Sequence, residues 1–242
     1  MADLDLNQHI TSHYDDKYAH SDFRSVQRIA IRRYPTHRNE AAVLWAGEGE
    51  NVLEIGSGSG DVLLTLADRF KRCVGVELSK VRAEESRKVF RNDPNTQIIH
   101  GNFESMNLDF PGSFFDTIIM SAVIEHLIDP FLVLEKIHGL LKPGGRVLIE
   151  TPNIAKWTRR IKLLFGVFPG TASLDEGFIQ YDKKTPTTLH DEGHFHYFTF
   201  RSLKKALLRA HFTRVEYRGY GTNMLARVYP QLFSECFVIG VK

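Results

Sequence analysis

The sequence predicts an α/β fold in which helices cover both faces of a doubly wound, mostly parallel sheet. Short β-rich runs alternate with helical patterns from residue 51 to about residue 150. The centres of these runs are almost continuously apolar, which is typical of strands buried on both faces of a parallel sheet. Repeated β-α-β units connect through right-handed crossovers, so this alternation indicates a doubly wound sheet.

Seven segments are predicted as strands, each short and rich in β-branched or aromatic residues. Five of them belong to the alternating part of the chain, and two follow a C-terminal helix. They are residues 51–56, 73–78, 97–102, 115–121, 146–151, 214–221 and 236–242.

Three helices are predicted between the first five strands, at residues 60–70, 79–92 and 130–142. The third has the clearest signals. Asp129 can cap its N-terminus, and Pro130 suits the first helical position. The sequence KPGG that follows it ends the helix and turns the chain.

Further helices are predicted on both sides of this core. Residues 22–46 have a helical pattern that is broken near Pro35. Residues 198–212 form an amphipathic helix for which Thr199 is a suitable N-cap. Residues 154–196 are too long for a plain connection in a compact domain, so we expect a lid or acceptor-binding insert there.

Length and composition favour one domain. The chain has 242 residues, 43% of them hydrophobic. We expect residues 1–47 to form an N-terminal helical flap, 48–153 the cofactor-binding core, 154–196 the insert and 197–242 the rest of the sheet.

The charge balance and the two cysteines indicate which partners and which cellular compartment the protein has. There are 31 basic and 29 acidic residues, so no strong electrostatic case for nucleic acid exists. Cys73 and Cys236 lie in apolar runs and are predicted to be buried free thiols. Neither a signal peptide nor a spanning segment is apparent, which predicts a soluble cytoplasmic protein. The oligomeric state is left open.

The stretch VLEIGSGSGD at residues 52–61 predicts a ligand site. A buried strand leads into Gly56, Gly58 and Gly60, which permit a tight turn and close approach of a ligand to the backbone. Glu77, about 20 residues on, can accept hydrogen bonds from ribose hydroxyls. A dinucleotide or an adenosyl sulfonium would fit. The third glycine comes one residue early for a dinucleotide loop and Glu54 lies close by, which favours cationic S-adenosylmethionine.

Three stretches together resemble class I S-adenosylmethionine-dependent methyltransferases. They are VLEIGSGSGDVLLTLADRFKRCVGVELS, FDTIIMSAVIEHLIDPFLVLEKIHGLLKPGGRVLIETPN and GHFHYFTFRSLKKALLRAHF, and the resemblance covers about residues 48–221. The third stretch is similar to a broad bacterial and archaeal subgroup that includes ubiquinone-pathway and glycan or small-molecule methyltransferases. The resemblance implies a Rossmann-like, seven-stranded sheet whose last strand, at 236–242, is antiparallel.

The same resemblance implies which residues hold the cofactor. The methionine and ribose side would be lined by Glu54, Gly56, Ser57, Gly58 and Gly60. Glu77 would hold the ribose hydroxyls, Leu78, Asn102 and Phe103 would contact the adenine, and Ser121 would lie under the cofactor. Asn102 departs from the aspartate common in the family, although its amide oxygen can still accept from an adenine amino group.

Glu125 and His126 follow the fourth strand, beside the expected position of the transferable methyl group. Three interpretations stay open. His126 can act as a general base toward an acceptor hydroxyl, with Glu125 as its catalytic neighbour. The pair can instead belong to a metal site, or His126 can simply shape the pocket wall.

The metal interpretation is not favoured. The segment VIEHL resembles the E-x-x-E-H pattern of ubiquinone-pathway O-methyltransferases and small-RNA 2′-O-methyltransferases, but Ala122 replaces the first glutamate. His194 or His196 could complete a set with Glu125 and His126. We therefore predict S-adenosylmethionine as the cofactor and no metal.

The acceptor pocket is predicted from the helix entry GHFHYF and from the insert. His194, His196 and Tyr197 would join His126 there, although packing before the next helix equally accounts for the two histidines. In residues 154–170 a basic amphipathic helix can form a lid, which is favoured, or contact a membrane surface. Tyr14 and Tyr18 can fold over the cofactor as part of the flap.

These observations predict a methyltransferase that acts on an oxygen of a small-molecule, sugar or glycan-linked acceptor. Methylation of a quinone or lipid-like acceptor is one alternative. RNA 2′-O-methylation is another, and the near-neutral charge and Ala122 argue against it. A non-catalytic, cofactor-binding partner subunit and a nicotinamide-linked oxidoreductase are the remaining alternatives.

Overall fold

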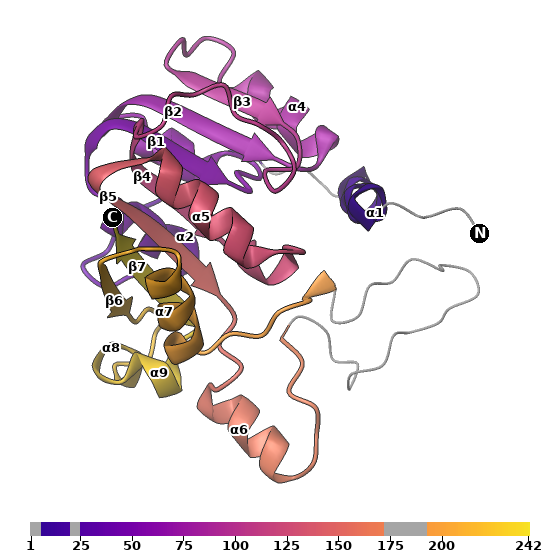
Figure 1. The fold of residues 1–242 in the computed structure, drawn as a ribbon, viewed down its shortest axis with the longest axis vertical. Coiled ribbons are helices and arrows are strands. Elements are labelled where there is room, and N and C mark those ends of the chain that lie inside the picture. The colour runs from indigo at the N-terminus through magenta and orange to yellow at the C-terminus, as the bar shows by residue number, and fades with distance from the viewer. Residues whose placement is uncertain (1–5, 20–24, 172–192) are drawn as a thin grey trace.

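The computed structural model describes residues 6–19, 25–171 and 193–242 and contains a seven-stranded sheet, with the order β3-β2-β1-β4-β5-β7-β6 (Figure 1). The first five strands run parallel to their neighbours, while β7 lies antiparallel to both β5 and β6. The predicted fold class is confirmed, including the antiparallel last strand. The strands are β1 Gly49–Ile55, β2 Phe70–Glu77, β3 Thr96–His100, β4 Phe115–Ser121, β5 Leu141–Thr151, β6 Arg214–Arg218 and β7 Cys236–Val241.

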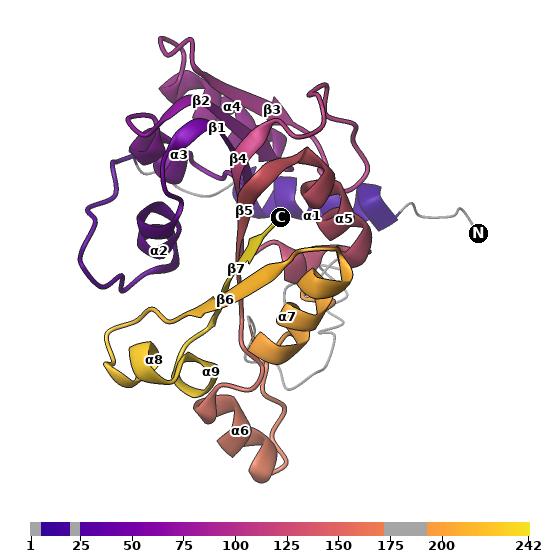
Figure 2. The same ribbon diagram turned by 60° about the vertical axis from the view of Figure 1, so that its left-hand side comes forward.

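Helices cover both faces of this sheet (Figure 2). Alternate strand residues face two separate apolar clusters, one shared with α5 and α7 and the other with α2, α3 and α4. Cys73 and Cys236 are buried free thiols, as predicted. The helices are α1 Leu6–Ala19, α2 Arg38–Trp45, α3 Asp61–Leu66, α4 Lys80–Val89, the 3-10 turn η1 Ile124–His126, α5 Pro130–Leu140, α6 Trp157–Leu164, α7 Phe200–Arg209, α8 Leu225–Val228 and α9 Pro230–Phe233.

Local capping fixes the N-termini of α5 and α7, which pack on the same face of the sheet. The Asp129 carboxylate accepts from the N–H groups of Phe131 and Leu132, both at 3.0 Å, at the start of α5. Thr199 and Ser202 form a reciprocal capping box at the start of α7. Both N-termini begin where the sequence predicts them.

The KPGG turn lies inside a strand, not before it. β5 begins at Leu141, and its pairing with β4 shifts register between Leu141 and Arg146. The four residues between these positions form a bulge, and Gly144 supplies a φ of 76°. The prediction that the fifth strand begins at residue 146 was therefore short by this bulged part.

The helix predicted over residues 22–46 is wrong for residues 25–37. This segment has no regular secondary structure, and several of its N–H groups donate to side-chain acceptors and not to helical carbonyls. The N–H groups of Gln27 and Ile29 donate to Asp61 and Thr65, both at 2.9 Å. Only α2 is helical in this part of the chain. Helix α1 lies within the predicted N-terminal helical flap, whereas α8 and α9 were not predicted.

In the ranges that the structure describes, no helix combines the length and apolar character that crossing a bilayer requires.

Candidate active site

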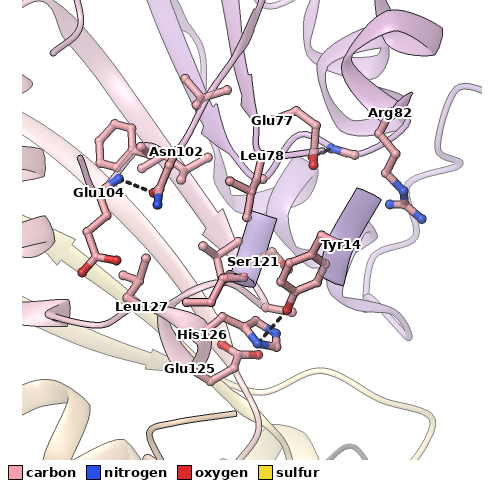
Figure 3. A pocket seen from close by; sticks show the side chains of 18 of the residues that line it. Tyr14, Glu77, Leu78, Arg82, Asn102, Glu104, Ser121, Glu125, His126 and Leu127 are labelled. Carbon is pink, nitrogen blue, oxygen red and sulfur yellow. Dashed lines mark hydrogen bonds between the residues drawn. The ribbon is translucent and has the colours of Figure 1, made fainter. Parts of the chain in front are cut away.

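A cavity of about 460 Å³ opens at the carboxyl ends of β1, β2 and β4 (Figure 3). Parallel strands end at the same edge of a sheet, so the loops that follow them meet at this point. The walls also include part of α1, the first residue of α2, Pro152 just before the predicted insert, and Thr171 within it. Residues 172–192 of the predicted insert lie outside the described ranges.

The glycine loop forms one end of the cavity. Gly56 and Gly58 have φ values of 74° and 54°, in the left-handed region, and both line the cavity. A Cβ on Gly56 would lie 2.5 Å from a methyl carbon of Val123, so no other residue fits there. Gly60 has a different role. A Cβ on Gly60 would lie 2.7 Å from the Phe90 ring, so the lack of a side chain at this position allows α3 and α4 to pack together.

Glu77 is held in place beside this loop. Its two carboxylate oxygens accept from the N–H groups of Gly58 at 2.7 Å and Ser79 at 2.9 Å. Burial raises the pKa of Glu77, while the two N–H donors and the charge of Arg82 lower it. Each oxygen has a second lone pair, so the carboxylate can also accept from a ligand in the cavity.

Glu54 and Ser57 lie behind the loop and are not among the described residues that line the cavity. Both are about 5% exposed. Among the described residues, no hydrogen-bond partner meets Glu54 Oε2. Burial, followed by the negative charges of Glu77 and Asp61, raises the pKa of Glu54 well above its ordinary value. Direct ligand contact by Glu54, Ser57 and Gly60, none of which is among the described lining residues, stays a prediction.

The loop after β3 forms the opposite wall with Asn102 and Phe103. The Asn102 side-chain oxygen accepts from Glu104 N at 2.9 Å, which tightens the loop (Figure 3). The Glu104 carboxylate accepts from the N–H of Ile128 at 3.0 Å and so joins this loop to the segment after β4. Lys136 Nζ donates to Phe103 O at 2.5 Å. Leu78 lines the cavity between the two walls.

The acceptor end is built around His126. Its Nδ1 lies 2.9 Å from Gly193 O and 2.9 Å from the hydroxyl of Tyr14. A carbonyl oxygen only accepts, so Nδ1 must carry the proton in the contact with Gly193. This tautomer puts the ring lone pair on Nε2. Ser121 lies nearby and donates to Glu150 at 3.2 Å.

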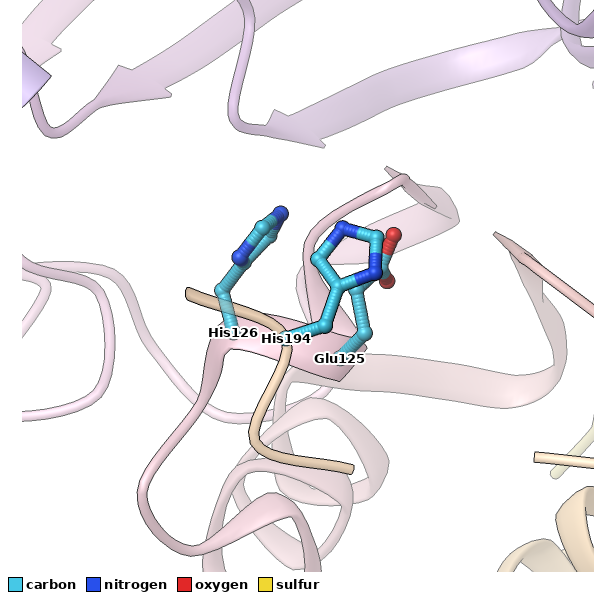
Figure 4. A group of neighbouring side chains, drawn as sticks. All are labelled: Glu125, His126 and His194. Atoms are coloured by element: carbon cyan, nitrogen blue, oxygen red, sulfur yellow. The ribbon is translucent and has the colours of Figure 1, made fainter. Parts of the chain in front are cut away.

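Glu125 is almost completely buried beside His126 (Figure 4). Its Oε2 accepts from the Thr151 hydroxyl at 3.0 Å. Burial, followed by the charge of Glu150, raises the pKa of Glu125 to about 8. The Glu125 carbonyl accepts from Phe195 N at 2.8 Å and His196 N at 3.1 Å, which holds the segment before α7 against the site.

His194 completes a three-residue cluster with Glu125 and His126. The two histidine rings are 4.5 Å apart between centroids, and one potential ligand atom from each of the three residues lies within 4.8 Å of the others. Within the described ranges, Glu125 Oε1 has no hydrogen-bond partner. The donor types suit a divalent ion. Ala122, with a φ of 53°, leaves the set one carboxylate short of the E-x-x-E-H pattern.

Two predicted acceptor residues lie elsewhere. His196 Nε2 is 3.4 Å from Ile128 O, and the Tyr197 ring packs edge-on against Phe168 at 6.2 Å between centroids. Neither is among the described residues that line the cavity. The prediction that they join His126 and His194 in the pocket is therefore not supported, and packing before α7 accounts for both.

Sequence reasoning missed two cations in the cavity walls. Arg38 begins α2. Burial raises the pKa of Glu150, and the charge of Arg38 opposes this rise. Arg82 lies on α4, with its guanidinium carbon 3.6 Å from the Tyr18 ring centroid. No spacing in the sequence links either arginine to the glycine loop. The lining residues Ile10, Tyr14 and Tyr18 of α1 do recur at helical spacing, a signal that their sequence contains.

Comparisons with known proteins agree with this architecture. A family model described as "Methyltransferase domain" matches residues 24–217. A protein of Mycolicibacterium smegmatis named "Probable S-adenosylmethionine-dependent methyltransferase" is 32% identical over 133 residues, 54% of this chain and 50% of that protein. The ubiquinone biosynthesis O-methyltransferase of Pseudomonas aeruginosa is 29% identical over 122 residues, 48% of this chain and 52% of that protein.

The fold is also shared with solved structures. The S-adenosylmethionine-dependent methyltransferase of Mesorhizobium loti has a TM-score of 0.58 at 17% identity, over 84% of this chain and 95% of that one. The matches to the first curated relatives span about half of their length or less. The family model covers most of the chain, and on that ground the protein belongs to the methyltransferase domain family.

Proposed function

We propose that the protein is an S-adenosylmethionine-dependent methyltransferase that methylates a hydroxyl oxygen of a small-molecule, sugar or glycan-linked acceptor. One observation carries this proposal: a single cavity joins the Gly58–Glu77 pair at one end to the His126–His194 pair at the other. A cofactor held at the first pair would present its reactive end to an acceptor at the second.

The cavity residues match the parts of the cofactor. Glu77 would accept from the ribose hydroxyls, and Leu78 and Phe103 would enclose the adenine. Arg38 would pair with the α-carboxylate, since a guanidinium binds a carboxylate through two N–H groups. The buried Glu54 lies behind the loop that would hold the cationic end of the cofactor.

When bound, S-adenosylmethionine supplies a methyl group on a cationic sulfur. Transfer of that methyl group to the acceptor oxygen would break the carbon–sulfur bond, and the acceptor hydroxyl would have to give its proton to a base. His126 Nε2 is the base that we assign to this proton, because contact with Gly193 O fixes the proton of the free ring on Nδ1. Glu125 is a positioning residue, because its backbone carbonyl holds the segment that carries His194.

The alternatives are tested by the acceptor and by metal removal. The name of the Pseudomonas aeruginosa relative keeps a quinone-type acceptor as the second candidate. Ala122 and the formal charge of +2 argue against an RNA acceptor. If Glu125, His126 and His194 held a divalent ion, chelation would stop turnover; we expect turnover to be unchanged.

Calorimetric titration of S-adenosylmethionine tests the cofactor site. Gly58→Val introduces a side chain 3.1 Å from Arg82 at a left-handed position, and we expect binding to be lost. Gly144→Val is the matched control, with φ 76° and open space around its Cβ. Undiminished binding by Gly58→Val would contradict the proposal. Binding by the wild type without methyl transfer to any hydroxyl acceptor would indicate a partner subunit.

A further inference from the structure

Helix α6 lies at one extremity of the molecule (Figures 1 and 2). Its apolar face is exposed, with Trp157 at 43% and Ile161 at 45%. Trp157, Ile161 and Leu164 are four and three residues apart, so they share one side of the helix. Leu164 is 79% exposed and the adjoining Phe165 76%. None of the helix residues is buried.

Ion pairs hold the opposite side of α6 against the rest of the protein. Glu235 accepts from Lys156 at 2.8 Å and from Arg159 at 2.7 Å, and the Arg159 side chain is only 14% exposed. An α-helix turns by about 100° per residue, so Arg159 and Ile161 lie about 200° apart. The ion pairs therefore hold the helix with its apolar face directed away from the protein.

Basic residues flank this apolar face. Residues 154–170 contain four cations and no acidic residue. Lys156 and Arg159 pair with Glu235, while no carboxylate in the described ranges pairs with Arg160 or Lys162. An apolar strip bordered by Lys and Arg, with Trp and Phe at its two ends, complements an anionic bilayer surface, where apolar side chains enter the acyl boundary and cations meet phosphate groups.

We propose that α6 and Phe165 dock the protein on the surface of an anionic phospholipid bilayer. A protein partner is less well matched, since eight residues form a helix only about 12 Å long, which cannot supply the roughly 800 Å² per side of a stable interface. The chain leaves the cavity wall at Pro152, passes through α6 and returns to the wall at Thr171, so docking would bring the cavity to the membrane. This inference does not depend on the proposed function.

Trp157 provides the measurement, because the chain has only two tryptophans. In a Trp45→Phe background, its emission is recorded as vesicles of phosphatidylcholine, with or without phosphatidylglycerol, are added. We expect a blue shift and co-sedimentation with the phosphatidylglycerol vesicles only. Leu164→Glu with Phe165→Glu should weaken binding about tenfold or more. Arg160→Gln with Lys162→Gln should remove the preference for anionic lipid.

Leu208→Glu is the matched control, an exposed leucine on α7 that should leave vesicle binding unchanged. Far-UV circular dichroism and S-adenosylmethionine affinity establish that each variant is folded. Three results would overturn the proposal. The wild type could fail to bind phosphatidylglycerol vesicles, the Leu164/Phe165 variant could bind them as well as the wild type, or the wild type could bind vesicles of phosphatidylcholine alone equally well. Self-association of the wild type that the same variant abolishes would instead assign the face to a second copy of the chain.

Discussion

The Tyr14 hydroxyl lies 2.9 Å from Nδ1 of His126, which joins the first helix to the acceptor end of the cavity. The Gly193 carbonyl reaches the same nitrogen, so three distant parts of the chain meet at one ring. The contact therefore links the position of α1 in the cavity wall to the orientation of the histidine ring.

Tyr14→Phe removes this hydrogen bond and keeps the aromatic wall. One neutral hydrogen bond contributes about 0.5–1.5 kcal/mol, so we expect turnover to fall by up to about tenfold. The Kd for S-adenosylmethionine should change by about twofold or less, since Gly193 still holds the ring. Turnover kinetics and calorimetry measure the two effects. A large loss of cofactor affinity with normal turnover would show that Tyr14 serves the cofactor and not His126.

The substitution His126→Asn tests whether His126 acts as a general base or only forms part of the pocket wall. If Nε2 takes the acceptor proton, kcat should fall by about 10²-fold or more, and the acidic limb of the pH–rate profile should disappear. Cofactor affinity should be retained. His194→Asn is the comparison, because it alters the neighbouring ring and leaves the base in place. Full turnover by His126→Ala with normal cofactor affinity would assign His126 to the wall.

Much of the fold follows from the sequence because apolar runs and caps are local signals. The five parallel strands and the starts of α5 and α7 are examples. Residues 25–37 were mispredicted because their N–H groups bond to side chains on other elements, a tertiary effect that local propensity does not contain.

The site was predicted less completely for the same reason. His194 and His196 are two residues apart, and regular extended backbone would point both to one side. The N–H groups of Phe195 and His196 both bond the Glu125 carbonyl, which breaks this alternation and leaves only His194 in the cavity. Arg38 reaches the glycine loop only through folding, so no motif could identify it.

Glu125 should make stability depend on pH. Its pKa is about 8 in the folded protein against an ordinary 4.5, so the folded state retains a proton that the unfolded state has lost between these values. The free energy of unfolding therefore falls as pH rises through this window, by an amount on the order of 5 kcal/mol. Glu125→Gln should flatten the dependence in denaturant unfolding at several pH values. Glu135→Gln, on the exposed side of α5, should not, and equal slopes for both variants would contradict the prediction.

Arg38→Gln tests the proposed carboxylate contact, and decarboxylated S-adenosylmethionine makes the test specific. Loss of a charged hydrogen-bonded pair costs about 1.5–3 kcal/mol, so the variant should bind S-adenosylmethionine roughly ten- to a hundredfold more weakly. The decarboxylated cofactor lacks the carboxylate that Arg38 would bind, so wild type and variant should bind this ligand equally. Arg38 also lies near buried Glu150, and a general disturbance of that region would weaken both ligands alike. Equal losses for the two ligands would thus remove Arg38 from the cofactor contacts, while a loss confined to the natural cofactor would locate the methionine end beside α2.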